Sequence, residues 1–247
     1  MITLLRIGFL IAIIALWELA AHAVGRNFVP TPWNTVLAAQ RLLAEGRLQT
    51  ALGESLTVYF SGYAIALGLG IALGVLMGGF RIFGKTVEIY VFALAATPRV
   101  AFIPLIIVLL GLGVESKVFI VFLGAIMPII INTYAGVLAV DSELVEMARS
   151  VGARRGRIFL GIVLPSAVPF VVVGMRIGAT IGLINTVVAE LYTAVRGLGG
   201  LLALYGNTFR MAEYFVIVIC LAIIGVVVTE ALRLLEVRFA RWRQRAG

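Results

Sequence analysis

Long stretches without a single charged residue constrain this chain more than any other feature. They cover residues 55–80, 100–114, 118–140, 158–175, 177–189 and 214–229. A helix needs roughly 20 apolar residues to cross the hydrocarbon core of a bilayer. Inside that core every backbone polar group needs an internal partner, and the strands of a membrane barrel would alternate in polarity. The mean hydropathy of +1.11 agrees, so we predict an all-α, polytopic membrane protein.

Six transmembrane helices are expected, at 4–24, 54–79, 87–110, 118–140, 164–190 and 212–234. The first resembles a signal peptide, because Ala21-His22-Ala23 has the small-residue pattern of a cleavage site, but we expect a retained span. Residues 25–50 form a polar connector. The stretch TVLAAQRLLAEGRLQTAL (35–52) has the leucine and alanine spacing of a helix that lies along the membrane surface.

Lysine and arginine are distributed unevenly between the two sides that these spans define. With a cytoplasmic N-terminus, the inner segments carry twelve of the 20 basic residues and the outer segments six. Cytoplasmic loops are enriched in basic residues, so both termini are predicted to face the cytoplasm, with the chain in the cell (inner) membrane. The expected organisation is a first span with an extracytoplasmic connector in 1–50, a core of five spans in 51–235 and a basic cytoplasmic tail in 236–247.

One segment matches a nucleotide-binding pattern. Residues 79–86 read GFRIFGKT and fit the G-x4-G-K-[ST] spacing of a P-loop. A P-loop follows a strand and opens a helix in a soluble parallel sheet, whereas this segment lies in a short turn between two predicted spans. We therefore interpret it as a basic inner loop, and the chain is not expected to hydrolyse ATP.

Residues for metal or redox chemistry are scarce. The chain has one cysteine, Cys220, and one histidine, His22, whereas metal sites combine several such ligands. The sequence shows no pair of midplane carboxylates and no nucleophile beside a base. We expect no catalytic residue, no metal site and no cofactor bound by this chain.

Glycines recur every four residues in two of the predicted spans. Small residues at this spacing allow helix backbones to approach closely in a membrane. The predicted helix-packing positions are Gly70, Gly74 and Gly78 in the second span and Gly174, Gly178 and Gly182 in the fifth.

A basic insert at 141–164 interrupts the apolar pattern between spans four and five. Asp141 or Ser142 can cap a helix whose first turn is acidic. We expect that helix over 143–151, ending at Gly152, which accepts a left-handed conformation. A second short helix should reach Pro165, which suits the first turn of the next span. Four arginines are expected to be exposed at this surface: Arg149, Arg154, Arg155 and Arg157.

The insert resembles the cytoplasmic loop of ABC importer permeases, which carries the pattern E-A-A-x3-G-x9-I-x-L-P. The chain has corresponding residues at this spacing, with methionine in place of the first alanine: Glu146, Met147, Ala148, Gly152, Ile162, Leu164 and Pro165. Residues 97–137 and 174–190 are similar to permeases of the nitrate, sulfonate, taurine and bicarbonate type. The likeness covers about 52–234.

This resemblance implies a type I importer permease fold of six transmembrane helices. It implies a homodimer of permeases, two cytoplasmic ATPase subunits that bind ATP and Mg, and an extracytoplasmic substrate-binding protein. The helix 143–151, with Arg149, would be the coupling helix that docks on the ATPase. The solute would be small and anionic. Related permeases serve importers of thiamine-precursor pyrimidines or riboflavin-like molecules, so the substrate stays open. A stand-alone carrier or channel is the alternative from another class, and it would not need this docking loop.

Ionisable residues inside the predicted spans indicate function, because charge is costly to bury in a bilayer. Arg99 lies between Pro98 and Pro104, so its helix should be broken there. Arg176 and Glu190 are fourteen residues apart and thus within about 40° around a helix. The candidates for lining a translocation pathway are Arg99, Asn132, Arg176, Asn185, Thr186 and Glu190. The alternative for Arg99 and Arg176 is a structural role, paired with a carboxylate or with free carbonyls.

Overall fold

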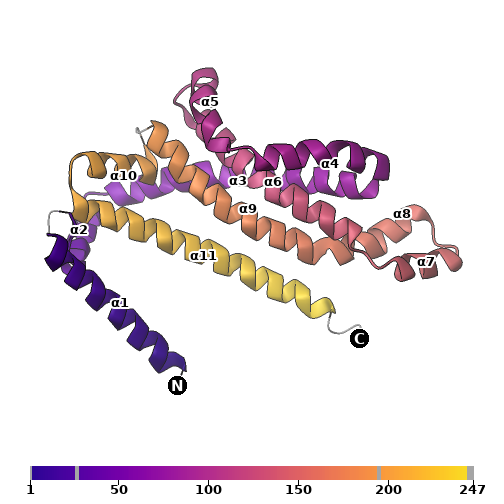
Figure 1. The fold of residues 1–247 in the computed structure, drawn as a ribbon, viewed down its shortest axis with the longest axis horizontal. Helices are drawn as coiled ribbons and strands as arrows, with labels where there is room; N and C mark the ends of the chain where they lie inside the picture. The colour runs from indigo at the N-terminus through magenta and orange to yellow at the C-terminus, as the bar shows by residue number, and fades with distance from the viewer. Residues whose placement is uncertain (1, 26–27, 194–195, 244–247) are drawn as a thin grey trace. The chain divides into compact units, whose positions relative to one another are not determined.

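Helices account for every element in the part of the chain that the structure describes (Figure 1). The computed structural model describes residues 2–25, 28–193 and 196–243, with side chains over 4–25, 28–193 and 196–234. Five described helices are long and apolar enough to cross a bilayer, and they correspond to five of the six predicted spans. The chain divides into two compact units, Met1–Leu56 with Glu190–Ile224 and Thr57–Ala189 with Gly225–Gly247.

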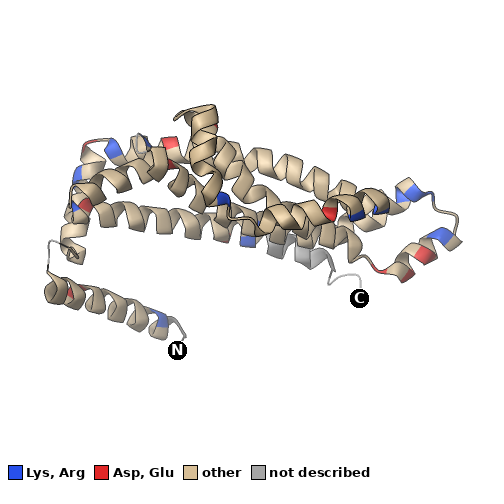
Figure 2. Cartoon of the chain, turned by 45° about the horizontal axis from the view of Figure 1, so that its top comes forward, with Lys and Arg blue, Asp and Glu red and all other residues tan. Residues whose placement is uncertain are grey.

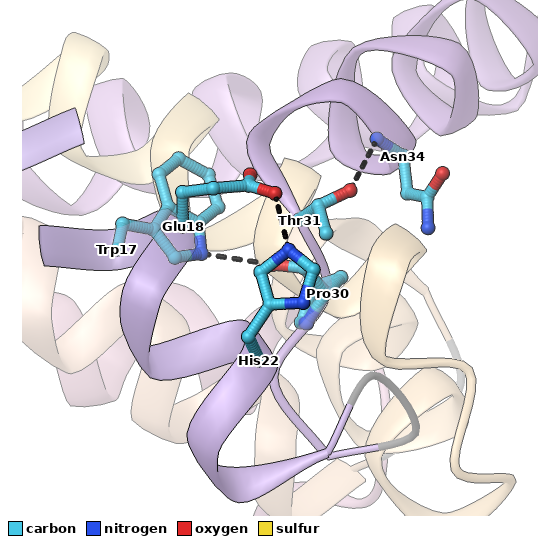
Figure 3. Close-up of polar contacts among 6 residues, drawn as sticks. All are labelled: Trp17, Glu18, His22, Pro30, Thr31 and Asn34. Carbon is cyan, nitrogen blue, oxygen red and sulfur yellow. Dashed lines mark hydrogen bonds and ion pairs between the residues drawn. The ribbon is translucent and has the colours of Figure 1, made fainter. Parts of the chain in front are cut away.

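The first unit begins with α1 (Ile2–Val24), the first predicted span. The indole N–H of Trp17 donates to the carbonyl of Pro30 at 2.9 Å, and its ring stacks on Phe215 with centroids 5.7 Å apart. Thr31 follows Pro30 and caps α2 (Pro32–Ala44), because its hydroxyl accepts the N–H of Asn34 (Figure 3). These contacts fix the entry to the connector.

The connector is not the single helix that its leucine spacing predicted. Helix α2 ends at Ala44, and α3 (Arg47–Gly79) begins three residues later. Gly46 between them has φ +73°, a left-handed conformation that interrupts the helix and that glycine adopts without steric cost. The C-terminal part of the predicted surface helix, residues 47–52, therefore belongs to the start of the 33-residue helix α3.

The second unit contains α6 (Val114–Leu138) at its centre. Its apolar core includes Tyr59, Val121, Ala125 and Ile129, all nearly inaccessible. The glycines of α3 lie against α6, since a Cβ at Gly70, Gly74 or Gly78 would overlap Ile129, Thr133 or Val137 respectively. Gly174 and Gly178 of α9 (Leu164–Thr193) approach α6 in the same way, whereas Gly182 leaves room for ordinary contact.

The third predicted span is bent. Helix α4 (Arg81–Ala96) stops before Pro98, a short 3-10 turn η1 (Arg99–Phe102) follows, and α5 (Ile103–Leu110) completes the segment. The two halves meet at 82°. This confirms the break predicted at Arg99. Thr97, which precedes Pro98, is extended, as the residue before a proline prefers, whereas Pro104 lies in the first turn of α5, a position that suits proline.

The insert at 141–164 contains α7 (Ser142–Ser150) and α8 (Arg155–Ile158). The first matches the predicted helix. The second was predicted as a separate helix, but it continues through a π-helical turn η2 (Phe159–Val163) into α9. Figure 2 shows acidic and basic residues gathered on this insert, with few charges along the long helices.

Two further helices complete the described chain. Helix α10 (Gly197–Asn207) was not predicted from the sequence, and α11 (Met211–Arg243) contains the last predicted span. Part of the predicted basic tail, 236–243, continues α11 as helix. The rest of that tail, 244–247, lies outside the described residues.

Candidate functional site

Helix α7 is held in shape by caps at both ends. At its start, the carboxylate of Asp141 accepts the N–H of Glu143 at 2.9 Å. At its end, Gly152 has φ +78° and donates its N–H to the carbonyl of Arg149 at 2.9 Å. The N–H of Ala153 reaches the carbonyl of Ala148 at 3.0 Å. This pair of bonds satisfies carbonyls that a helix end leaves open, so the helix is defined although none of its residues is buried.

One face of α7 carries exposed apolar side chains. Leu144, Met147 and Val151 are 46%, 63% and 80% exposed, and their spacing places them within about 60° around the helix. Val145 and Ala148 are only half-exposed; Ala148 lies at the edge of this face, about 40° from Leu144, and Val145 lies about 100° from Leu144. The predicted docking residues divide in the same way, with Glu146, Met147, Arg149, Gly152 and Pro165 exposed and Ala148, Ile162 and Leu164 half-buried.

The segment that matched a P-loop is helical here. Phe80 precedes α4, and Arg81 to Lys85 form its first turns. Gly84 is buried, and a Cβ there would overlap the carbonyl of Met77. The hollow beside it is lined by Leu76, Phe80, Ile82, Phe83 and Thr86. The matched residues thus open a helix that follows another helix, and they form no glycine-rich loop after a strand, which is the context that a P-loop requires.

Arg99 lies at the bend between α4 and α5, and its guanidinium donates hydrogen bonds to backbone carbonyls of α6. Its Nη1 donates to the carbonyl of Gly124 at 2.8 Å and more weakly to that of Leu123 at 3.5 Å. Pro128 stands four residues after Gly124 and has no N–H to donate to that carbonyl. The arginine thus supplies the missing donor, which is the carbonyl pairing considered from sequence.

The uncharged pathway candidates bond to their own helices. The amides of Asn132 and Asn185 donate to the carbonyls of Pro128 and Ile181, and the hydroxyl of Thr186 donates to that of Gly182. Asn185 also lies against Gly124, where a Cβ would overlap its amide. Arg99 and Asn185 therefore meet at the same turn of α6, although they are far apart in sequence.

Glu190 belongs to the first unit, where it holds the start of α10. Its carboxylate, 1% exposed, accepts the hydroxyl of Ser55 and the N–H of Gly199, each at 2.8 Å. Ser55 in turn accepts the N–H of Leu198 at 2.8 Å. We call this group (Ser55, Glu190, Leu198 and Gly199) the α10 clasp. A negative charge at a helix N-terminus is favourable, and it stabilises a helix whose first turn is rich in glycine.

Gly197 starts α10 beside the clasp. It has φ +86°, and a Cβ there would overlap the Glu190 carboxylate. Its N–H donates to Glu54 at 2.9 Å. The sequence contains a signal for this arrangement. Glu190 lies at the end of a predicted span, and Gly-Leu-Gly-Gly follows at 197–200. By itself it indicates only a pathway candidate, because its partner Ser55 is 135 residues away. The pathway roles of Glu190 and Arg176 stay predictions.

Lys117, like Ser55 of the α10 clasp, is a residue that the sequence did not single out. It lies in the first turns of α6 and is 5% exposed. Within the described residues it makes no hydrogen bond and no ion pair. The charge pattern alone assigns it to an outer loop. A sequence does not show which helices pack around a residue, so its low exposure could not be predicted.

Solved structures share this arrangement of helices. A methionine ABC transporter solved in inward-facing conformations has a chain that aligns with a TM-score of 0.65 at 20% identity, covering 75% of this chain and 93% of that one. At this identity the match shows the fold, which is that of a type I ABC importer permease.

Sequence relatives carry the comparison further. A probable ABC transporter permease of Brucella abortus (strain 2308) is 34% identical over 91% of this chain and 90% of its own. A putative aliphatic sulfonates transport permease of Escherichia coli (strain K12) is 34% identical over 94% and 89%. A formylaminopyrimidine transport permease of Halalkalibacterium halodurans is 26% identical over 96% and 95%.

The family model agrees with the structure and with the relatives. The model described as the inner membrane component of binding-protein-dependent transport systems matches residues 50–242. That range includes nearly all of α3 to α11, with the capped loop helix α7. The chain therefore belongs to the family of binding-protein-dependent transport system inner membrane components, the permease subunits of ABC importers.

Proposed function

We propose that this permease moves a small organic anion of the sulfonate class and that cytoplasmic ATPase subunits dock on α7. The observation that carries the docking is the apolar face of Leu144, Met147 and Val151 on an otherwise charged insert. Exposed apolar side chains of this kind, flanked by charges, are typical of a surface that binds a partner. The chain binds no nucleotide itself in this proposal, and ATP and Mg belong to the ATPase.

Membership of the family supports the rest of the proposed assembly. Two copies of the permease would form the pathway, and an extracytoplasmic binding protein would deliver the solute. The excess of lysine and arginine on one side supports cytoplasmic termini. Similarity to an aliphatic sulfonates permease at 34% identity, against 26% for the formylaminopyrimidine permease, supports a sulfonate as the solute.

A charge placed on the α7 face tests the docking directly. Met147→Glu should prevent the ATPase subunits from copurifying with the permease and should lower transport at least tenfold, because a carboxylate would be desolvated in the interface. The side chain is 63% exposed, so the thermal stability of the isolated permease should not change. Met147→Leu is the matched control and should retain the ATPase. Normal copurification with Met147→Glu would contradict the proposed surface.

Arg99→Gln tests the pathway role of the arginine at the bend. If Arg99 offsets the cost of bringing an anion into low dielectric, anion uptake should fall at least tenfold, about 1.4 kcal/mol in the barrier. Binding-protein-stimulated ATP hydrolysis should survive. The measurement is uptake per assembled complex in proteoliposomes.

Pro128→Ala separates the pathway role from a structural one. Alanine restores an N–H that can pair with the Gly124 carbonyl, so Arg99 would no longer be needed as its donor. If Arg99 is only structural, the double variant Arg99→Gln/Pro128→Ala should transport like Pro128→Ala alone. A pathway role predicts that the double variant stays defective, and rescue would retire that role.

A further inference from the structure

The turn between α3 and α4 carries two exposed basic side chains, Arg81 and Lys85, which we call the basic pair. Within the described residues neither makes a hydrogen bond or an ion pair. They are four residues apart and so lie within about 40° of each other around α4. No acidic residue occurs between Glu54 and Glu88, and Glu88 accepts the hydroxyl of Tyr134 at 3.2 Å. The basic pair therefore presents two positive charges to its surroundings.

An apolar hollow of about 630 Å³ opens beside the basic pair. Its lining comes from the end of α3, the turn and the start of α4, and consists of Leu76, Phe80, Ile82, Phe83 and Thr86. Thr86 is the one polar residue of the five, and its hydroxyl donates to the carbonyl of Ile82 at 2.9 Å. Lys85 lies about 60° from Ile82 around α4. A ligand in this hollow would thus meet hydrocarbon on its inner side and cations at its edge.

The hollow continues as an exposed apolar face along α4. Ile89 follows Ile82 by seven residues, which is about 10 Å along the helix and within about 20° around it. Tyr90 has the same relation to Phe83. Ile89 and Tyr90 are 69% and 65% exposed. A hydrocarbon chain can therefore lie in the hollow and continue along α4 while a charged group at its end stays beside the basic pair.

The hollow lies at the same end of the second unit as the basic insert. A Cβ at Gly79, the last residue of α3, would lie 3.2 Å from the ring of Phe159 in η2. Figure 1 shows the turn between α3 and α4 beside α8 at this end. In the orientation proposed above, this end is at the cytoplasmic surface of the membrane. Long basic side chains at such a level keep their charge among the lipid headgroups.

We propose that the basic pair and the hollow form a binding site for one anionic phospholipid. An acyl chain occupies the hollow and the face along α4, and the phosphodiester accepts hydrogen bonds from the guanidinium and the ammonium. The inference goes beyond the proposed function, because it depends on neither the solute nor the ATPase. A free phosphate would leave the hollow unfilled, and a zwitterionic lipid would bring its own cation to the basic pair. Basic sites of this kind therefore favour anionic headgroups.

Lipid retention by the purified permease in detergent tests the site. Dioleoylphosphatidylglycerol and dioleoylphosphatidylcholine have the same acyl chains and differ in headgroup charge. Native mass spectrometry should show one phosphatidylglycerol bound at a concentration at least tenfold below that needed for phosphatidylcholine. Arg81→Gln/Lys85→Gln should bind both lipids alike. Arg81→Lys/Lys85→Arg exchanges the two cations and should keep the preference.

The matched control is Arg6→Gln/Arg154→Gln. It also removes two exposed cations, neither of which lines the hollow, and it should keep the preference. Ile82→Asn probes the hollow with both cations in place and should weaken phosphatidylglycerol binding at least threefold, because Ile82 is 87% exposed to the proposed chain. Glycerol 3-phosphate, an anion without acyl chains, should not displace the lipid at tenfold molar excess.

Four outcomes would each overturn the inference. Equal binding of the two lipids by the wild type would remove the site. An equal loss of preference in the control variant would mean that net charge alone attracts the lipid. Displacement by glycerol 3-phosphate would assign the basic pair to free phosphate. Loss of ATPase copurification in Arg81→Gln/Lys85→Gln, with the lipid preference intact, would assign it to an acidic protein surface.

Discussion

Gly152→Pro should reduce transport at least a hundredfold while the permease still inserts and its spans keep their stability. Gly152 has φ +78°, whereas proline is fixed near −65°. Proline also removes the N–H that bonds to Arg149 at 2.9 Å. The end of α7 would have to unwind, and the Leu144, Met147 and Val151 face would lose its shape. Stimulation of ATP hydrolysis by loaded binding protein, measured on the assembled complex, should be lost together with uptake.

Two milder variants at the same position separate backbone geometry from a general effect of substitution. No atom lies within 4 Å of a Cβ built at Gly152, so only the left-handed backbone opposes a side chain. Asparagine tolerates that conformation and should keep most of the transport, while alanine should lose stability at the loop by about 1–2 kcal/mol. If Gly152→Pro transported as well as Gly152→Asn, the capped end of α7 would have no part in coupling.

Gly74→Leu should prevent the second unit from folding in a detectable amount. A Cβ at Gly74 would lie 2.6 Å from the Cβ of Thr133 and 2.8 Å from the carbonyl oxygen of Ile130. Neither atom can move without displacing α6, and overpacking of this kind costs about 1–3 kcal/mol or more before the rest of the leucine is placed. The yield of monodisperse protein in detergent and its thermal midpoint are the measurements.

Gly68→Leu is the matched control for this experiment. Gly68 lies in the same helix, is exposed, and would have no atom within 4 Å of an added Cβ. The substitution improves helix propensity and should leave the yield unchanged. Equal losses in Gly68→Leu and Gly74→Leu would mean that α3 tolerates no large residue anywhere, and the close approach of α3 to α6 would not explain the effect.

Local signals in the sequence were sufficient for most of the helices. Uncharged runs located the spans, Pro98 and Pro104 located the bend, and Asp141 with Gly152 located both ends of α7. Each of these depends on neighbouring residues, because hydropathy, missing N–H groups and caps act within one or two helical turns. The glycine repeat also indicated close packing, although only the structure shows that Gly62 and Ala66 extend it toward the start of α3.

The functional assignments depended on distant partners, and there the sequence was less informative. Glu190 reads as a charge inside a span until Ser55 and the start of α10 are seen to bind it. Arg99 reads as an isolated cation until Pro128 is seen to leave the Gly124 carbonyl without its donor. Lys117 reads as a loop residue until the helices around it reduce its exposure to 5%. Burial and pairing are properties of segments that meet only after folding, so the tertiary structure alone decided how each of these charges is placed.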